Sequence, residues 1–236
     1  MKLDVLAIGA HRDDIELSCG GTIIKLVDEG YEVGVLDLTQ GEAGTRGTAK
    51  ERAREAKNAA KCMGITLRKN LYLPDAGVNN TEAAQHKIIH ILRKYQPDMV
   101  IIPYWEGRHP DHYKTSILSY ESCFFSGLSK LKIGGLAHRP SKIVYYMAFQ
   151  ETHPSFIIDI TEQFQKKMEA IKCYKSQFSD SEDGKNIFMP ANDIFELLEA
   201  RARVYGAIIG KKYGEAFLAK QPLEIEDMMT IKGKFI

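Results

Sequence analysis

The chain has 236 residues, of which 44% are hydrophobic and 27% are charged, a balance typical of globular proteins. Its formal net charge of +1 gives no reason to expect a nucleic acid or an acidic membrane as partner. No apolar run approaches the roughly 18 residues that cross a bilayer, and the first residues form a strand pattern rather than a signal peptide. Cys19, Cys62, Cys123 and Cys173 lack a metal-binding spacing and are expected to be reduced thiols, which predicts a cytoplasmic protein.

Residues 1–102 alternate between strand patterns and helix patterns. The strand-like runs are short and rich in β-branched residues, whereas the helix-like runs repeat their apolar residues at helical spacing. A capping box, Thr48-x-x-Glu51, indicates where the second helix begins, and Pro97 ends the third. The predicted elements are a strand at 4–9, a helix at 20–30 closed by Gly30, a strand at 31–39, a loop at 40–48, a helix at 48–64, a strand at 70–73, a helix at 80–95 and a strand at 99–102.

This alternation predicts an α/β fold, a Rossmann-like three-layer sandwich with a mostly parallel sheet and helices on both faces. The strand order in such sheets commonly runs 3-2-1-4, which would make the strands at 4–9 and 99–102 neighbours. No repeat or linker interrupts the chain, so residues 1–236 are expected to form a single domain. The later predicted elements are helices at 113–127, 161–174 and 193–209, strands at 142–147 and 156–160, and a polar loop at 179–184.

Two polar clusters follow those neighbouring strands. The first is Ala10-His11-Arg12-Asp13-Asp14, and the second is Arg108-His109-Pro110-Asp111-His112. Histidine and aspartate are costly to bury without a partner, and a divalent cation is the usual partner. The first cluster alone could be a polar turn, and the second makes a metal site the better interpretation. Because the topology would bring both to the crevice where ligands bind, the sequence predicts one composite metal site.

His11, Asp14 and His112 would offer a catalytic zinc ion two imidazoles and one carboxylate, with one position left for water. Zinc lowers the pKa of such a water to about 7, although iron(II) suits the same ligands. Asp13 would lie beside the metal without binding it, and is therefore the expected general base. Since no thiolate accompanies these ligands, a closed structural zinc site is disfavoured.

His109 precedes His112 by three residues and is expected to face the same pocket. As an imidazolium it would stabilise a tetrahedral oxyanion. Asp111 would orient or charge one of the two histidines. Together these groups suit the hydrolysis of an amide or an ester.

These motifs resemble the PIG-L/LmbE-like family of zinc-dependent N-acetylglucosaminyl deacetylases. The resemblance implies that Asp13 is the base and that His109 polarises the carbonyl. It extends over nearly the whole chain. The matching motifs are the two polar clusters, Cys19-Gly20-Gly21-Thr22, Leu38-Thr39-x-Gly41-Glu42, Tyr174-Lys-Ser-Gln-Phe178 and Glu199-Ala-Arg201.

Within this family the chain resembles the branch that makes bacillithiol, in which an N-acetylglucosaminyl-malate is deacetylated. The resemblance implies zinc held by His11, Asp14 and His112, a small-molecule N-acetylated amino sugar as substrate, and a homo-oligomer. It also implies that Arg52 and Arg108 lie near the malate carboxylates. The fork geometry of arginine suits a dicarboxylate.

One departure from the family pattern is Arg12, which stands where proline is usual. Arg12 is expected to point to solvent, the commoner state of an arginine. An alternative for Arg52 is an exposed helix arginine that pairs with an acid such as Glu55. An alternative for Asp111 is the N-cap of the following helix.

The leading functional hypothesis is therefore a zinc-dependent deacetylase of N-acetylglucosaminyl-malate. One alternative is a deacetylase of another N-acetylglucosamine conjugate. Another is a non-catalytic Rossmann-type module that binds a nucleotide or a sugar, against which stands the missing glycine fingerprint. A metal-dependent phosphoesterase is disfavoured because two-metal sites need more carboxylates than the clusters contain.

Overall fold

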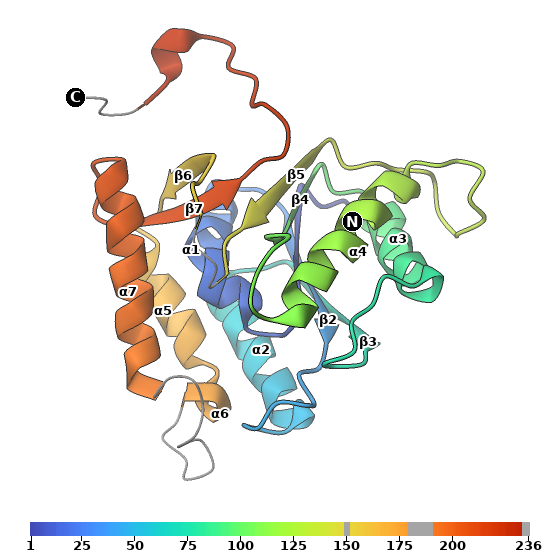
Figure 1. Ribbon diagram of the computed structural model, residues 1–236, viewed down its shortest axis with the longest axis horizontal. Coiled ribbons are helices and arrows are strands. Elements are labelled where there is room, and N and C mark those ends of the chain that lie inside the picture. Colours follow the sequence, from blue (N-terminus) through green and yellow to red (C-terminus); the bar gives the residue numbers. More distant parts are fainter. Residues whose placement is uncertain (149–151, 179–190, 233–236) are drawn as a thin grey trace.

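The computed structural model describes residues 1–148, 152–178 and 191–232. A seven-stranded sheet with the order β3-β2-β1-β4-β5-β7-β6 runs through the molecule (Figure 1). The strands are β1 (Val5–Gly9), β2 (Val33–Thr39), β3 (Leu67–Leu73), β4 (Met99–Pro103), β5 (Lys142–Tyr146), β6 (Phe156–Asp159) and β7 (Gly214–Leu218). The helices are α1 (Asp14–Asp28), α2 (Ala49–Met63), α3 (Glu82–Tyr95), α4 (Pro110–Ser126), α5 (Phe164–Lys172), α6 (Lys175–Phe178) and α7 (Ala191–Ile208), with a 3-10 turn η2 (Met228–Thr230).

The strand order 3-2-1-4 predicted from the sequence is confirmed, as is the mostly parallel sheet. β1 pairs with β4 in a register that joins Val5 to Met99 and Ala7 to Ile101, so the carboxyl ends of the two strands lie close together. The sequence did not predict β7, which runs antiparallel between β5 and β6. Its residues begin with a glycine and a glutamate, which are both depleted in strands, so the segment gives no clear strand pattern.

Helices cover both faces of the sheet, as predicted (Figure 1). The alternation of side chains along β1 supplies both cores, because Leu6 and Ile8 face one side while Val5 and Ala7 face the other. One core includes residues of α3 and α4, such as Ile88, Leu92 and Leu118. The other includes residues of α1, α2 and α5, such as Ile15, Ile23, Met63 and Ala170.

The capping signals placed α2 correctly. Thr48 and Glu51 form the predicted capping box, and Gly64 closes the helix in the left-handed conformation at φ 76°. Gly30, at φ 90°, follows α1 as expected. Helix starts were predicted less well, because α1 begins at residue 14 rather than 20, α4 at 110 rather than 113, and α5 at 164 rather than 161. The loop predicted at 179–184 lies outside the described residues.

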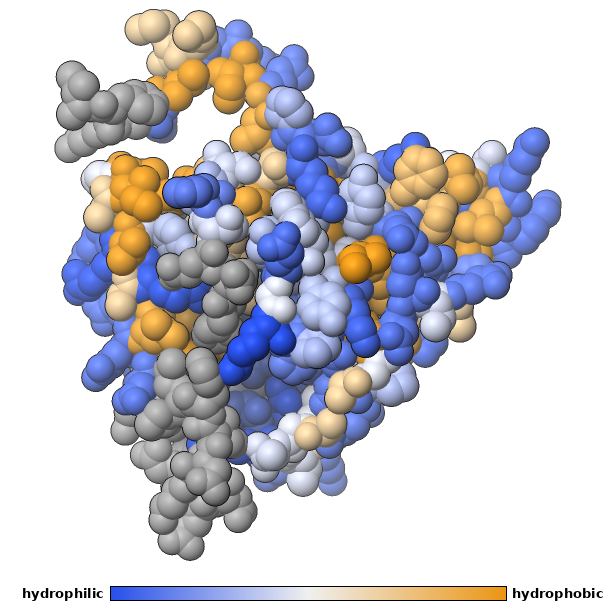
Figure 2. Space-filling model, viewed as in Figure 1, coloured by the Kyte–Doolittle hydropathy of each residue, from blue (hydrophilic) through white to orange (hydrophobic). Residues whose placement is uncertain are grey.

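The surface view in Figure 2 is largely hydrophilic on the face shown, with hydrophobic side chains gathered on α7 and on the segment that follows β7. Within the described ranges, no helix combines the length and the apolar character that a membrane span requires. The four cysteines are free thiols, and Cys19 and Cys123 are buried.

Candidate active site

The two polar clusters meet at the carboxyl ends of β1 and β4. Asp14 begins α1, His112 lies in the first turn of α4, and His11 is on the turn that leaves β1. Their ligand atoms all lie within 4.8 Å of one another. Asp14 is central, because its Oδ1 is 3.1 Å from Nε2 of His112 and its Oδ2 is 3.6 Å from Nδ1 of His11. The backbone N–H of His11 also donates to Oδ2 of Asp14 at 2.9 Å, which fixes the turn.

The second nitrogen of His11 faces two further carboxylates. Its Nε2 is 3.0 Å from Oδ1 of Asp75 and 3.7 Å from Oδ2 of Asp111. A metal-binding histidine commonly donates its other ring N–H to a carboxylate, which fixes the tautomer. A proton on Nε2 that is donated to Asp75 leaves Nδ1 of His11 facing Asp14. The sequence reasoning missed Asp75, although its position directly after β3, at the same edge of the sheet, was a signal.

The charges of this cluster suit a divalent cation. Burial alone would lower the pKa of His11, but Asp14, Asp111 and Asp75 raise this pKa well above its ordinary value. Burial would raise the pKa of Asp14, but His112 and His11 hold it well below its ordinary value. The pKa of Asp75 falls to about 2, because hydrogen bonds from His11 and from the Ala43 backbone outweigh burial. Several ionised carboxylates around two imidazoles thus attract a positive charge.

Asp111 is fully buried, and its Oδ1 accepts a hydrogen bond from the backbone N–H of Val78 at 3.3 Å. Its Oδ2 accepts none from the described residues and faces His11. The alternative in which Asp111 caps the following helix is wrong, because the N-cap of α4 is His109. An acid buried beside His11 is better placed to orient that ring than to cap a helix.

His109 accepts a hydrogen bond at Nδ1 from the backbone N–H of Asp111, at 3.2 Å. Its ring stacks on His112 with the centroids 4.8 Å apart. Burial and the neighbouring rings of His112 and His11 lower the pKa of His109. These contacts favour a neutral His109 with its proton on Nε2, rather than the imidazolium expected from the sequence.

Asp13 lies beside this cluster and is bound by Arg52. Nη2 of Arg52 is 3.1 Å from Oδ1 of Asp13, and its Nη1 donates to the carbonyl of Gly41 at 3.1 Å. A side chain on Gly41, at φ 71°, would collide with this guanidinium. The exposed Arg52 paired with Glu55 is therefore wrong, because Arg52 is buried and Glu55 accepts hydrogen bonds from Ser176.

The expectation that Arg12 points to solvent is also wrong. Arg12 is only 5% exposed, and its Nη1 donates to the carbonyl of Ala49 at 2.5 Å. The start of α2 therefore supplies the acceptor that solvent would have supplied. The backbone carbonyl of Arg12 accepts hydrogen bonds from Arg68 and from the hydroxyl of Tyr174. These two hydrogen bonds fix the backbone of the turn between His11 and Asp14.

Arg68 is the centre of a buried cluster, the Arg68 cluster, that comprises Glu16, Asp37, Arg68 and Tyr174. Arg68 donates to both oxygens of Asp37 at 2.9 Å and to Oε1 of Glu16 at 2.6 Å. The hydroxyl of Tyr174 donates to the same Glu16 oxygen at 3.0 Å. The sequence reasoning missed this cluster. Asp37, an acid inside the apolar run of β2, was the one local signal that a buried cation was required.

A cavity of about 120 Å³ opens beside the histidines. His109 and His112 form one side, and Arg108 lies exposed at its rim. Arg52 is not among the residues that line this cavity, and it is bound to Asp13 instead. The remaining lining residues are Pro103, Tyr104, Glu106, Gly107 and Ala148.

The loop 40–48 is bonded to its surroundings at both ends. The backbone N–H of Ala43 donates to Oδ2 of Asp75 at 2.8 Å, and the backbone N–H of Asp75 donates to Glu42 at 3.0 Å. Arg46 and Gln177 exchange hydrogen bonds of 2.7 Å with one another's backbone carbonyls. The loop therefore joins the site to α6.

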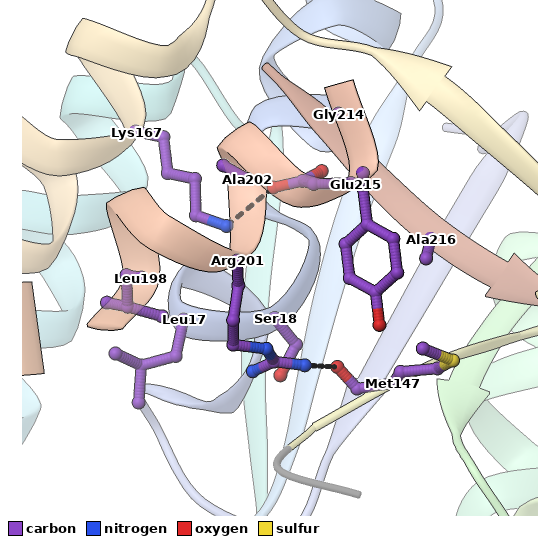
Figure 3. Close-up of a pocket in the computed structure, with 11 residues that line it drawn as sticks. Leu17, Ser18, Met147, Lys167, Leu198, Arg201, Ala202, Gly214, Glu215 and Ala216 are labelled. Carbon is purple, nitrogen blue, oxygen red and sulfur yellow. Dashed lines mark hydrogen bonds and ion pairs between the residues drawn. The ribbon is translucent and has the colours of Figure 1, made fainter. Parts of the chain in front are cut away.

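A second, smaller cavity of about 20 Å³ lies beside the ion pair of Lys167 and Glu215 (Figure 3). Lys167 points at Glu215 and approaches it to 2.6 Å. Glu215 also accepts hydrogen bonds from the backbone N–H groups of Gly21 and Thr22, at 2.9 and 2.7 Å, just after α1 is interrupted at Cys19. A cavity this small holds no more than a water. A side chain on Gly21 would collide with Ile160, and its N–H is bound to Glu215, so this glycine serves close packing rather than phosphate binding.

Comparison with known proteins places this arrangement in a family. Residues 6–122 match the family described as PIG-L, GlcNAc-PI de-N-acetylase. A diacetylchitobiose deacetylase of Thermococcus kodakarensis is 31% identical over 228 residues, which cover 89% of this chain and 80% of the relative. An uncharacterized deacetylase of Escherichia coli, YaiS, is 28% identical over 177 residues, which cover 73% of this chain and 90% of the relative.

Solved structures agree with these matches. The conserved protein TT1542 of Thermus thermophilus superposes with a TM-score of 0.88 at 32% identity, over 96% of this chain and 98% of the other. An N,N′-diacetylchitobiose deacetylase of Pyrococcus horikoshii gives 0.77 at 33% identity, over 90% and 82%. The 4-carboxy-2-hydroxymuconate hydratase GalB of Pseudomonas putida gives 0.79 over 97% and 100%, but at 21% identity it shares the fold alone. Because that fold also supports a hydratase, the reaction must be argued from the site.

Proposed function

The chain belongs to the PIG-L family of de-N-acetylases, and from its site we propose that it is a metal-dependent hydrolase that removes the acetyl group from an N-acetylglucosamine conjugate. The observation that carries this proposal is the convergence of His11, Asp14 and His112 with Asp13 beside them. The names of two relatives, which act on diacetylchitobiose, support an N-acetylated amino sugar as the substrate class.

We assign His11, Asp14 and His112 as the residues that would hold the cation, with zinc as the first choice. When bound, this ion supplies Lewis acidity, which lowers the pKa of a coordinated water and polarises the amide carbonyl. The fit rests on the close approach of the three ligand atoms and on the surplus of carboxylates around His11. Asp75 and Asp111 orient the imidazole of His11.

Asp13 is the proposed general base. Arg52 binds Oδ1 of Asp13, so the carboxylate has a fixed orientation, and we assign Oδ2 as the oxygen that accepts a proton from the attacking water. The water oxygen bonds to the carbonyl carbon, the C–N bond then breaks, and Asp13 returns the proton to the departing nitrogen. The products are acetic acid and the free amine, which at neutral pH become acetate and the ammonium form of the amino sugar.

His109 is proposed to stabilise the negative charge that develops on the carbonyl oxygen. Its Nδ1 already accepts a hydrogen bond from Asp111, so the donor must be Nε2–H. A neutral imidazole that is fixed by a helix terminus and by stacking on His112 is preorganised for this donation.

Within this substrate class we propose N-acetylglucosaminyl-malate, the substrate of the bacillithiol branch that the chain resembles. Arg108, at the rim of the cavity, would contact a malate carboxylate. Arg52 would reach malate only by exchanging Asp13 for it, so we assign Arg108 as the main contact. The second candidate, favoured by the relatives' names, is diacetylchitobiose.

We further propose that residues 1–236 act as one domain, that the protein works in the cytoplasm without a nucleic-acid or membrane partner, and that it forms a homo-oligomer. The resemblance described above supports the oligomer, and the compartment rests on the reduced state of the cysteines.

The decisive experiment measures acetate release by the zinc-loaded protein from N-acetylglucosaminyl-malate, diacetylchitobiose and N-acetylglucosamine. The malate conjugate should give a kcat/KM at least about tenfold above the others. Arg108→Ala should raise KM for that conjugate only. A higher kcat/KM for diacetylchitobiose would remove the malate assignment.

Asp13→Asn tests whether the site catalyses hydrolysis or only binds a ligand. This variant should keep its metal while kcat falls by about 10²- to 10⁴-fold. No acetate from any of the three compounds, with metal bound to wild type, would favour the non-catalytic sugar-binding module instead.

A further inference from the structure

The segment that follows β4 forms one wall of the cavity beside the histidines. Tyr104, Glu106 and Arg108 line this cavity together with His109 and His112. Tyr104 is buried, whereas Glu106 and Arg108 are exposed at the rim. The cavity therefore presents a carboxylate, that of Glu106, to which neither the metal site nor the proposed reaction gives a role.

Trp105 fixes this segment to the body of the molecule. Its ring packs edge-on against Tyr145 with the centroids 4.8 Å apart, and Nζ of Lys220 lies 4.7 Å from its centroid. The backbone N–H of Tyr104 donates to the carbonyl of Tyr146 at 2.9 Å. Because the residues just before Glu106 are held in this way, its backbone position at the cavity is fixed before a ligand binds.

Tyr104 also orients the carboxylate of Glu106. The hydroxyl of Tyr104 is hydrogen-bonded to the side chains of Glu106 and Thr152. Burial raises the pKa of Tyr104, and the negative charge of Glu106 raises it further, so the hydroxyl keeps its proton and donates it to the carboxylate. A carboxylate has about four acceptor positions, of which the Tyr104 hydroxyl takes one.

The chemistry of this rim suits a ligand with neutral hydrogen-bond donors. An ionised carboxylate only accepts hydrogen bonds, and the bonds that it accepts are among the stronger ones in proteins. A cationic ligand is disfavoured, because the guanidinium of Arg108 belongs to the same rim. The hydroxyl groups of a sugar are neutral donors, and they match a carboxylate in this setting.

We propose that Glu106 is a specificity-determining residue that accepts hydrogen bonds from hydroxyl groups of the N-acetylated sugar, and that Tyr104 is its positioning residue. This inference rests on the proposed deacetylase function, and it adds how the enzyme distinguishes a sugar from an N-acetylated amine without hydroxyl groups. A site built to bind a hydroxyl group discriminates against an analogue that lacks it, because a polar group of the site then loses its partner.

The test compares kcat/KM for methyl N-acetylglucosaminide and its 3-, 4- and 6-deoxy analogues, measured as acetate release by the zinc-loaded protein. Wild type should lose about tenfold or more on at least one deoxy analogue. In Glu106→Ala the same analogue should lose less than about twofold relative to the parent glycoside, because the partner of the missing hydroxyl is gone. Glu169→Ala, at an exposed position of α5, is the matched control and should keep the wild-type pattern.

Tyr104→Phe tests the positioning role. This variant should raise KM for the parent glycoside, change kcat little, and reduce the same deoxy penalty only in part, since Glu106 is still present. Zinc content should equal that of wild type in both variants. A lower kcat with an unchanged deoxy penalty would show that Tyr104 does not act through Glu106.

Equal deoxy penalties in wild type and Glu106→Ala would overturn the proposal, as would a wild type that shows no penalty for any analogue. If wild type released no acetate from any glycoside, the proposed function would fail instead. The dissociation constants of the same four glycosides, measured by calorimetry, would then test Glu106 independently of turnover, with the same pattern expected.

Discussion

The candidate metal site and the Arg68 cluster both contain buried carboxylates, and both contact the turn formed by residues 11–14. In the Arg68 cluster the positive charge is a fixed guanidinium that binds Glu16 and Asp37. In the site the carboxylates around His11 raise its pKa, so they favour a proton on this ring that a metal ion can replace. The comparison teaches that a permanently charged arginine stabilises the fold, whereas titratable imidazoles suit the binding of an exchangeable cation.

Burial sharpens this difference. Burial raises the pKa of Glu16 and of Asp37 even though Arg68 opposes the shift. The pKa of Asp14 moves in the opposite direction because two histidines surround it. The Arg68 cluster therefore needs its arginine for stability, and the site needs its histidines for binding.

The largest expected effect is on the metal. His112→Ala removes one of the three ligands, and we expect stoichiometric zinc binding to be lost and acetate release to fall to the background rate. Metal content after dialysis, measured by atomic emission, checks this. His138→Ala, which alters a loop histidine that hydrogen-bonds the carbonyl of Pro97, is the control and should keep full metal content. Full metal content in His112→Ala would move the site elsewhere.

The matching change in the Arg68 cluster should affect stability instead. Arg68→Met leaves Glu16 and Asp37 buried without their cation, and we expect the free energy of unfolding to fall by about 3–5 kcal/mol. Urea denaturation measures this loss. Lys69→Met, at the exposed neighbouring position of β3, should change the free energy of unfolding little. If Arg68→Met and Lys69→Met had equal free energies of unfolding, the Arg68 cluster would not stabilise the fold.

Asp75→Asn tests the carboxylate that orients His11. The variant keeps the size of the side chain but removes the charge that favours a proton on Nε2 of His11. We expect the dissociation constant of zinc to rise by about 10- to 100-fold. Competition with a chromophoric chelator measures it, and Asp98→Asn at the surface provides the control. An unchanged affinity would show that Asp111 alone orients the ring.

Tyr174→Phe should have the smallest effect, because it removes one of two donors to the Arg12 carbonyl. We expect a loss of about 1 kcal/mol in unfolding free energy and a small rise in the zinc dissociation constant. Tyr146→Phe, which removes a buried hydroxyl that bonds Ile8 in β1, is the control and should lower stability without weakening zinc binding. If Tyr174→Phe and Tyr146→Phe bound zinc with equal affinity, the Tyr174 hydroxyl would have no role in positioning the metal ligands.

The sequence determined the parallel half of the sheet and the ends of its strands. Periodicity and capping are local, so α2 and the order β3-β2-β1-β4 could be predicted from residues close together in the chain. Placing His and Asp at two strand ends was enough to predict that the first cluster meets the second, because the topology brings those ends together.

The tertiary structure alone decided which charged side chains are buried and with which partners. Arg12, Arg52 and Arg68 look alike in the sequence, yet the first binds a backbone carbonyl, the second Asp13, and the third Glu16 and Asp37. A buried arginine differs from an exposed one only through acceptors supplied by distant segments, and these leave no trace in local periodicity. For the same reason β7, whose pairing partners lie far away in the chain, could be identified only from the tertiary structure.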